Sequence, residues 1–347
     1  MLIIASPDFE AHVTPPGHPE RMERAQVFDA AAARWRERGA TIAEPRAATP
    51  AALLRVHDRA HIDAMAATAG RSVMLDADTF TSPESYDTAL RAAGAAVLAA
   101  DHALDHGEPA LALVRPPGHH AERDRAMGFC LFNNVAVAAA HAVARGLERV
   151  AIVDIDVHHG NGTQAMFYDD PRVLYVSTHQ FPFYPGTGAA EEVGTGEGTG
   201  FTFNVPLEAG ATDADYDLVY REAVAPVLRA FDPGLVLVSA GYDAHERDPL
   251  ASMRVTEAGF NSVITRLLAA APQGRIAFVT EGGYDLQALA ACLDVTFEAM
   301  ARHGVSENAA RSVPPIASSS SAPGAAARGE RALALVRKAQ RGHWKDL

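Results

Sequence analysis

The segment VAIVDIDVHHGNG, residues 150–162, places two carboxylates and two imidazoles directly after a short apolar run. Asp154, Asp156 and His158 stand at positions i, i+2 and i+4, so their side chains share one face if the segment continues as a β-strand. Unpaired carboxylates are costly to bury, and a bound cation removes that cost. Aspartate and histidine are both zinc ligands, so the pattern predicts a zinc site. The alternative is a buried polar network that caps the strand.

Polar and reactive residues also follow four other apolar runs. The runs 110–114, 173–176, 235–240 and 276–280 are followed by RPPGHH (115–120), STH (177–179), GYDAHERDPL (241–250) and EGGYD (281–285). In an open parallel sheet, ligands bind beyond the carboxyl ends of the strands. The repetition at five strand ends therefore favours a catalytic site over a structural network. A catalytic zinc needs three protein ligands and an open position, and Asp243 is the best placed third ligand.

Two adjacent histidines, His119 and His120, follow the stiff PPG turn. Imidazole is the usual general base near neutral pH, and each ring needs a partner that fixes its tautomer. Asp154 and Asn161 are candidates for these partners. In EGGY the two glycines let the backbone approach a ligand, and the Tyr284 phenol is able to donate a hydrogen bond to a developing oxyanion. The alternatives are hydrogen-bonded core histidines and a tyrosine packed in a loop.

A parallel sheet is the element that would bring these residues together. Strand-length apolar runs recur at 2–4, 110–114, 150–153, 173–177, 235–239 and 276–280. Helix-like stretches lie between many of them, at 82–104, 134–146, 212–231 and 255–271. This alternation predicts an α/β fold in which helices cover both faces of a mainly parallel central sheet.

The rest of the chain suggests one catalytic domain and a tail. We assign residues 1–312 to the catalytic domain, 313–329 to a flexible linker and 330–347 to a basic C-terminal tail with helical character. A loosely attached helix is favoured for the tail over a helix docked on the body or an oligomer contact. The glycine-rich stretch 180–202 is interpreted as a long surface loop of functional importance.

Composition excludes several classes of protein. The formal net charge of −13 argues against a nucleic-acid binder, which usually carries a basic face. Two cysteines, Cys130 and Cys292, cannot build a disulfide framework and fit a reduced cytoplasmic protein. The first residues lack the basic region of a signal peptide, and no apolar stretch approaches the roughly 20 residues of a membrane span. An oligomer remains compatible with these data.

Six motifs, in order, resemble the signatures of the zinc-dependent histone deacetylase superfamily: RPPGHH, GFCLFNN, VDIDVHHGNGTQ, STHQF…YPGTG, GYDAHERDPL and EGGY. The opening HPERMER (18–24) resembles that family too, and the likeness runs from about residue 14 to residue 290. Asn161 and Glu281 resemble the class II and bacterial branch, because class I typically has aspartate and glycine at these positions. The resemblance implies a single-domain arginase/deacetylase-like fold with its active site at the carboxyl ends of the strands.

The resemblance also implies a role for each residue at the strand ends. The implied zinc ligands are Asp156, His158 and Asp243, and the implied catalytic residues are His120, His119, Tyr284, Asp154 and Asn161. His120 would be the general base and later the acid, and Asn161 would orient it. His119 would be its electrostatic partner, hydrogen-bonded to Asp154. Tyr284 would polarise the substrate carbonyl.

Substrate and potassium sites are implied in the same way. The implied substrate-binding residues are Gly128, Phe129, Tyr184 and Gly283. Gly128 would accept the substrate amide through its backbone, and Phe129 and Tyr184 would form the walls of an acyl-lysine tunnel. Apart from the resemblance, Asp76 and Asp78 in LDADTF are candidates for holding the substrate backbone or an ammonium group at the tunnel rim. One potassium ion would bind Asp154, Ser177 and the carbonyls of Asp156, His158 and Thr178, and a second would bind carbonyls near Phe167, Asp170, Val173 and Phe201.

The implied function is zinc-dependent deacetylation of N6-acetyl-lysine in proteins, which releases acetate and free lysine. An acetylpolyamine amidohydrolase is the first alternative, because the same motifs serve both substrates and a ligand at the rim would distinguish them. A two-manganese ureohydrolase would need further bridging carboxylates, and metal counting would identify it. A catalytically inactive acyl-lysine-binding protein would show no activity on any acyl substrate.

Overall fold

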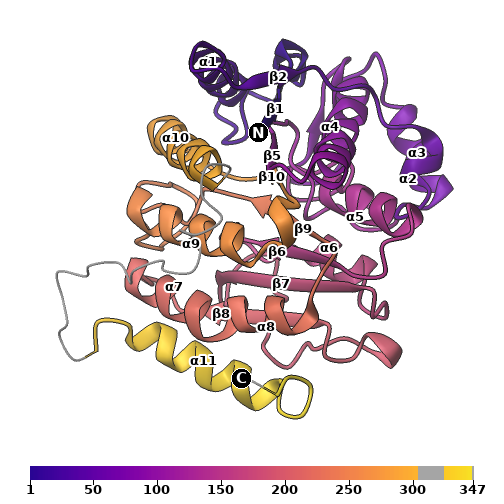
Figure 1. Ribbon diagram of the computed structural model, residues 1–347. Coiled ribbons are helices and arrows are strands. Elements are labelled where there is room, and N and C mark those ends of the chain that lie inside the picture. The colour runs from indigo at the N-terminus through magenta and orange to yellow at the C-terminus, as the bar shows by residue number, and fades with distance from the viewer. Residues whose placement is uncertain (304–323, 346–347) are drawn as a thin grey trace.

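Eight strands form the central sheet of the computed structural model, which describes residues 1–303 and 324–345. The strand order is β2-β1-β5-β10-β9-β6-β7-β8, and all neighbouring pairs are parallel (Figure 1). The strands are β1 (Leu2–Ile4), β2 (Thr41–Ala43), β5 (Ala110–Ala112), β6 (Val150–Asp154), β7 (Val173–Gln180), β8 (Thr202–Leu207), β9 (Leu235–Ala240) and β10 (Ile276–Thr280). The predicted α/β class with a parallel sheet is confirmed.

Helices cover both faces of this sheet. The helices on one face are mainly α1 (Glu23–Glu37), α7 (Asp213–Val219), α8 (Ala225–Phe231), α9 (Glu257–Ala270), α10 (Leu286–His303) and α11 (Ala327–Ala339). Those on the other face are α2 (Pro50–Leu53), α3 (Arg59–Ala66), α4 (Ser85–His106), α5 (Asn134–Ala144) and α6 (Asn161–Met166). No helix within the described residues is long and apolar enough to cross a membrane.

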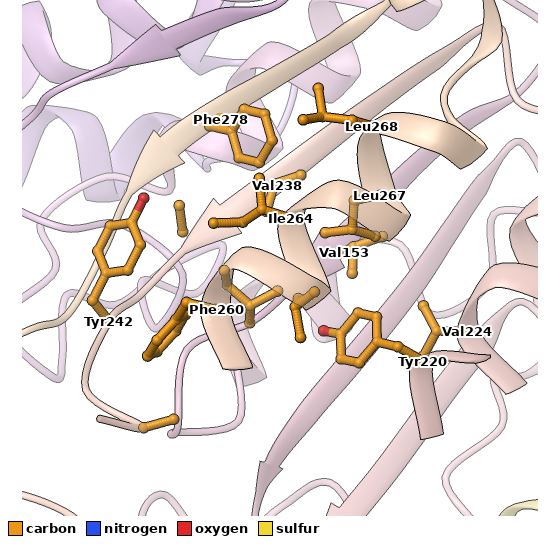
Figure 2. Packing of buried hydrophobic residues seen from close by; sticks show 14 of the residues in the cluster. Val153, Tyr220, Val224, Val238, Tyr242, Phe260, Ile264, Leu267, Leu268 and Phe278 are labelled. Carbon is orange, nitrogen blue, oxygen red and sulfur yellow. The ribbon is translucent and has the colours of Figure 1, made fainter. Parts of the chain in front are cut away.

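Strand residues alternate between the two faces, as the pleat of a strand requires. In β6, Ala151 and Val153 belong to the core on the α9 side, whereas Val150 and Ile152 belong to the opposite core. Figure 2 shows Val153 near the apolar side chains of α9. Because both faces are buried, the central strands β6, β7, β9 and β10 each begin with four consecutive apolar residues, which explains why the sequence reveals them so clearly.

Two strands of the central sheet were not predicted from the sequence, and both lie at its edges. β8, with the sequence TFNVPL, alternates apolar and polar residues and contains Pro206, so it lacks the continuous apolar run of a central strand. Proline is tolerated there because an edge strand leaves one side without ladder hydrogen bonds. At the other edge, β2 has only three residues. A small antiparallel pair, β3 (Val73–Met74) and β4 (Phe80–Thr81), lies apart from the main sheet.

Most of the predicted helices are present, with shifted ends. α4 begins at Ser85, three residues after the start of the stretch predicted at 82–104. The stretch predicted at 212–231 consists of α7, a π-helical turn over Tyr220–Val224, and α8. α1, α2, α3, α6 and α10 were not predicted.

The C-terminal helix is docked on the body of the protein, so the favoured interpretation of a loosely attached helix is wrong. α11 packs against α7 and β8, and Leu333 and Val336 are buried in the core. The Gln340 side chain donates a 2.7 Å hydrogen bond to the carbonyl of Thr202 in β8. α11 begins at Ala327, inside the stretch assigned to the linker, and residues 313–323 of that stretch lie outside the described residues.

Candidate active site

Five adjacent strands place the predicted reactive residues at one edge of the sheet. β5, β10, β9, β6 and β7 are consecutive in the sheet, and each carries one of the five polar segments at or after its C-terminal end. The segment STH (177–179) lies within β7 itself, whereas the others begin at or beyond the last residue of their strands. Because the strands are parallel, all five segments lie at the same edge of the sheet.

Asp156, His158 and Asp243 form a cluster at this edge. One potential ligand atom from each lies within 4.8 Å of the other two, and this is the only such group of three or more found among the described residues. His158 Nδ1 lies 3.2 Å from Asp156 Oδ1 and 3.1 Å from Asp243 Oδ2. One N–H cannot donate fully to two carboxylates, whereas one cation satisfies all three groups. A nitrogen and two carboxylate oxygens form a donor set that fits zinc.

The remaining carboxylate oxygens of this cluster are held by the backbone. Asp156 Oδ2 accepts a 2.8 Å hydrogen bond from the Gly282 amide, and Asp243 Oδ1 accepts one of 2.8 Å from the Val157 amide. These bonds orient the free oxygens toward His158, as outer hydrogen bonds do in metal sites. Burial opposes charge on His158, but its hydrogen bonds to the two carboxylates raise its pKa to about 10. Burial and the charge of Asp156 raise the pKa of Asp243 to about 7.

The local geometry differs from the strand expected over Asp154–His158. β6 ends at Asp154, and the chain bends through the next residues. Asp154 Oδ1 accepts from the Asp156 amide at 3.2 Å, and Asp156 Oδ1 accepts from the His158 amide at 2.9 Å. These are Asx turns, in which an aspartate bonds the backbone two residues later. The spacing of two therefore builds consecutive bends, and Asp154 lies outside the cluster of three.

Asp154 instead pairs with His119. Its Oδ2 lies 3.0 Å from His119 Nδ1 and accepts a hydrogen bond of 3.2 Å from the Tyr175 hydroxyl. Burial alone would lower the pKa of His119, but the charges of Asp156 and Asp154 outweigh it and raise that pKa well above its usual value. His119 is therefore a buried ring that is hydrogen-bonded to Asp154 beside the cluster.

The pKa of His120 is shifted in the opposite direction. Burial and the neighbouring imidazoles of His119 and His158 hold its pKa well below the usual value, so the ring is neutral. Its Nδ1 lies 2.8 Å from Asn161 Oδ1, while Asn161 Nδ2 donates to Glu122 Oε1 at 2.7 Å. The Glu122 carboxylate only accepts hydrogen bonds, so the Asn161 amide turns its NH₂ group toward Glu122 and its oxygen toward His120. Nδ1 of His120 must therefore carry the proton. Nε2 therefore keeps its lone pair, as a general base requires.

A cavity of about 240 Å³ gives access to these groups. It is lined by Asp78, Pro117, His119, His120, Gly128, Phe129, His158, Phe183, Tyr184, Leu250 and Tyr284. The Phe129 and Tyr284 rings meet edge to face at 5.9 Å, and the Tyr184 ring meets His120 in the same manner at 5.2 Å. No hydrogen bond to the Tyr284 hydroxyl is found within the described part of the chain. That hydroxyl is thus free to meet a ligand.

Gly128 is required by the crowding around His120. It has a φ of 55°, and a β-carbon there would lie 2.5 Å from Cδ2 of the His120 ring. The next residue, Phe129, also has a positive φ, and its amide donates to the Thr79 hydroxyl at 3.1 Å. The tight turn therefore places the Gly128 backbone against the base and the Phe129 ring on the cavity wall.

Two residues predicted near the substrate, Gly283 and Asp76, do not line the cavity. Gly283 does not line the cavity, because its carbonyl accepts a 2.8 Å hydrogen bond from Arg24 Nε in the interior. Asp78 lines the cavity, but Asp76 turns into its own loop, where Oδ1 accepts from the amides of Asp78 and Thr79.

The residues implied for the first potassium ion lie at the end of β6, in the bend that follows it, and on the adjoining strand β7. Asp154 is the direct neighbour of Ser177 in the sheet. The Ser177 hydroxyl bonds His179 Nδ1 at 2.9 Å, and the Thr178 hydroxyl bonds the Tyr220 hydroxyl at 3.0 Å. The oxygen donors suit a hard cation. The second set, at Phe167, Asp170, Val173 and Phe201, lies near the start of β7 instead.

Sequence reasoning missed several residues that build the site. The Phe183 ring stacks on His158 with 5.4 Å between centroids, and Leu250 completes the wall. Glu281 was noted only as a branch marker, yet its Oε2 accepts from the amides of Gly118 and His119 at 2.6 and 3.1 Å. Each of these residues stands inside or beside a motif quoted above, so proximity to a motif was the available signal.

Comparisons with known proteins point to one family. The family model described as histone deacetylase domain matches residues 18–300. A probable deacetylase of Archaeoglobus fulgidus is 40% identical over 296 residues, which are 82% of this chain and 81% of that protein. The chloroplastic histone deacetylase 10 of Oryza sativa is 39% identical over 284 residues, 76% of this chain and 64% of that one. The crystal structure of the HDA15 HD domain superposes with a TM-score of 0.89 at 34% identity, and covers 100% of this chain and 97% of that chain.

Proposed function

This chain belongs to the histone deacetylase family, and on that premise we propose that it is a zinc-dependent enzyme that hydrolyses the amide of N6-acetyl-lysine, or a related acyl-lysine, in proteins. The observation that carries the proposal is one cavity lined both by aromatic rings and by the reactive groups His120, His158 and Tyr284. A long aliphatic side chain that ends in an amide matches such a lining. The products are acetate and free lysine.

The residues of the chain divide the chemistry between them. When bound at Asp156, His158 and Asp243, zinc would polarise the scissile carbonyl and lower the pKa of the attacking water. His120 Nε2 takes a proton from that water as its oxygen attacks the carbonyl carbon. The Tyr284 hydroxyl donates a hydrogen bond to the carbonyl oxygen as negative charge develops there. The His120 imidazolium then returns the proton to the leaving nitrogen, and the carbon–nitrogen bond breaks.

His119 and Asp154 support this cycle without exchanging the proton. Burial and the neighbouring His119, whose ring centroid lies 4.0 Å away, hold the pKa of His120 down. Asn161 keeps the proton of His120 on Nδ1, so the lone pair on Nε2 stays available for the water.

Substrate contacts follow from the cavity walls. Phe129 and Tyr184 would enclose the aliphatic chain, the Gly128 carbonyl would accept the substrate amide, and Asp78 at the mouth would meet a backbone amide or an ammonium group. Tyr184 is 40% exposed and places a hydroxyl-bearing ring at the outer part of the wall. The proposed partners are acetylated protein lysines, and cytoplasm is the expected compartment.

Potassium is proposed as a structural ion. The first site would use Asp154, Ser177 and the carbonyls of Asp156, His158 and Thr178, and it would tie the end of β6 to the end of β7. The second would use carbonyls at Phe167, Asp170, Val173 and Phe201 near the start of β7.

Asp243→Asn is expected to lower the zinc content from one ion per chain to a small fraction of that value. The amide removes the negative charge that zinc binding uses, while the side chain keeps its volume. Metal analysis of the purified variant after dialysis checks this, with Asp217→Asn, a buried carboxylate on α7 that does not line the cavity, as the control. An unchanged zinc content would remove Asp243 from the ligand set, and two metal ions per chain in the parent would favour a dinuclear site.

The test of the function is acetate release by the zinc-loaded protein. Acetyl-lysine peptides are compared with acetylated putrescine and spermidine at equal concentrations, and we expect higher kcat/KM for the peptides. Higher kcat/KM for the polyamines would make the enzyme an acetylpolyamine amidohydrolase, and Asp78 at the cavity mouth is the feature that favours this second candidate. No release from any acyl substrate would favour an acyl-lysine-binding protein.

A further inference from the structure

The Glu20 carboxylate is fully buried and lies between the fully buried guanidinium groups of two arginines. Its Oε1 lies 2.9 Å from Arg24 Nη1 and 2.5 Å from Arg115 Nε, and its Oε2 lies 2.8 Å from Arg115 Nη2. All three side chains are completely shielded from solvent. Burial would raise the pKa of Glu20, but the charge of Arg115 outweighs it and keeps the carboxylate ionised.

The two arginines lead to two different loops of the candidate active site. Arg24 donates to the carbonyls of Glu281 and Gly283, and its guanidinium carbon lies 5.2 Å from the centre of the Tyr284 ring. Arg115 begins the RPPGHH segment, which continues to His119 and His120.

Glu20 is therefore the anion shared by the loop that carries Tyr284 and the loop that carries the two histidines. We propose that Glu20 is a positioning residue, which sets the distance between the Tyr284 hydroxyl and His120 through Arg24 and Arg115. Glu20 does not line the cavity, so it acts only through its neighbours. The inference rests on the proposed deacetylation, in which both groups act on the same carbonyl.

The geometry explains why a carboxylate is needed at this position. Its two oxygens accept three N–H groups that come from two separate chain segments, and a guanidinium fork matches a carboxylate in this way. An amide in place of the carboxylate turns one acceptor into a donor that faces an arginine N–H. Arg24 then loses its anchor, and the carbonyls of Glu281 and Gly283 lose the group that holds them.

The experiment is a double-mutant cycle between Glu20→Gln and Tyr284→Phe, read as kcat and KM for acetate release. We expect Glu20→Gln to lower kcat by about 10- to 100-fold with little change in KM, since misplaced reacting groups cost turnover more than binding. In the Tyr284→Phe background, Glu20→Gln should lower kcat by a clearly smaller factor, because the hydroxyl that Glu20 positions is already absent. If Glu20→Gln lowered kcat by the same factor in both backgrounds, the proposal would be overturned.

A matched control separates positioning from stability. Asp217 is also a buried carboxylate between arginines, with Arg266 Nη2 at 2.6 Å and Arg221 Nη1 at 3.0 Å, but it lies between α7 and α9. Asp217→Asn should lower the melting temperature while kcat stays near the parental value. If Glu20→Gln does not fold, Glu20→Asp, which keeps the charge but shortens the reach, replaces it in the cycle.

Hydrogen exchange gives a readout that needs no activity. The Gly282 amide donates to Asp156 and the Tyr284 amide to Asp248, at 2.8 and 2.7 Å. Peptides that span 281–285 should exchange faster in the Glu20 variant than in parent or Asp217→Asn, and unchanged exchange would overturn the proposal. If the parent releases no acetate, the proposed function fails, and this exchange measurement still decides the role of Glu20.

Discussion

Replacement of His120 by alanine is expected to lower kcat for acetate release by about 10²- to 10⁴-fold, the usual range for removal of a general base. His120 is the neutral imidazole on the cavity wall, and its Nδ1 proton is engaged by Asn161. Alanine leaves no group that takes the proton of the attacking water. Zinc content should stay near one ion per chain, because His120 lies outside the cluster of Asp156, His158 and Asp243.

The measurement combines steady-state kinetics with metal analysis on the same preparation. His61→Ala is the matched control, because His61 is a buried histidine that bonds the Leu131 carbonyl at 2.9 Å and does not line the cavity. Parental turnover in His120→Ala would remove the residue from the mechanism. Loss of zinc together with activity would show instead that His120 acts on the metal site.

Replacement of Tyr284 by phenylalanine is expected to lower kcat by about 10²- to 10³-fold, with a much smaller effect on KM. This range is that of a single oxyanion donor, whose hydrogen bond strengthens only as the transition state forms. The phenyl ring keeps the edge-to-face contact with Phe129 and the place beneath Arg24, so the cavity wall is preserved.

Separate determination of kcat and KM checks this expectation. Tyr242→Phe is the control, because that buried hydroxyl bonds Thr296 at 3.0 Å and lies outside the cavity lining. Equal turnover in Tyr284→Phe and parent would refute the oxyanion role. A rise in KM alone would assign Tyr284 to ground-state binding.

The sequence by itself determined the fold class and pointed to the candidate residues of the site. Strands buried on both faces contain continuous apolar runs, and reactive residues that follow five such runs must meet at one edge if the strands are parallel. Asp156, His158 and Asp243, and the two histidines at 119 and 120, could therefore be named without coordinates. The two edge strands, β2 and β8, could not be predicted. β2 has only three residues and β8 alternates apolar and polar residues, and such patterns also occur in loops.

Side-chain direction was decided only by the tertiary structure. The spacing of two between Asp154, Asp156 and His158 suggested a continuing strand, but the same spacing allows each aspartate to bond the backbone two residues later. Those bonds bend the chain and turn Asp154 toward His119. Whether Gly283 faces the cavity or the interior likewise depends on Arg24, which is 259 positions away in the chain.

Long-range pairing explains the rest of what the sequence left open. Glu20 and Arg115 are 95 positions apart, and nothing in either local pattern shows that one buried anion serves two loops. α11 is a basic helix by its composition, and only its contacts with β8 and α7 show that it is docked on the body of the protein. Residue types and periodicity are local properties of the chain, whereas the pairing of buried charges and the covering of a sheet edge arise only when distant segments pack together.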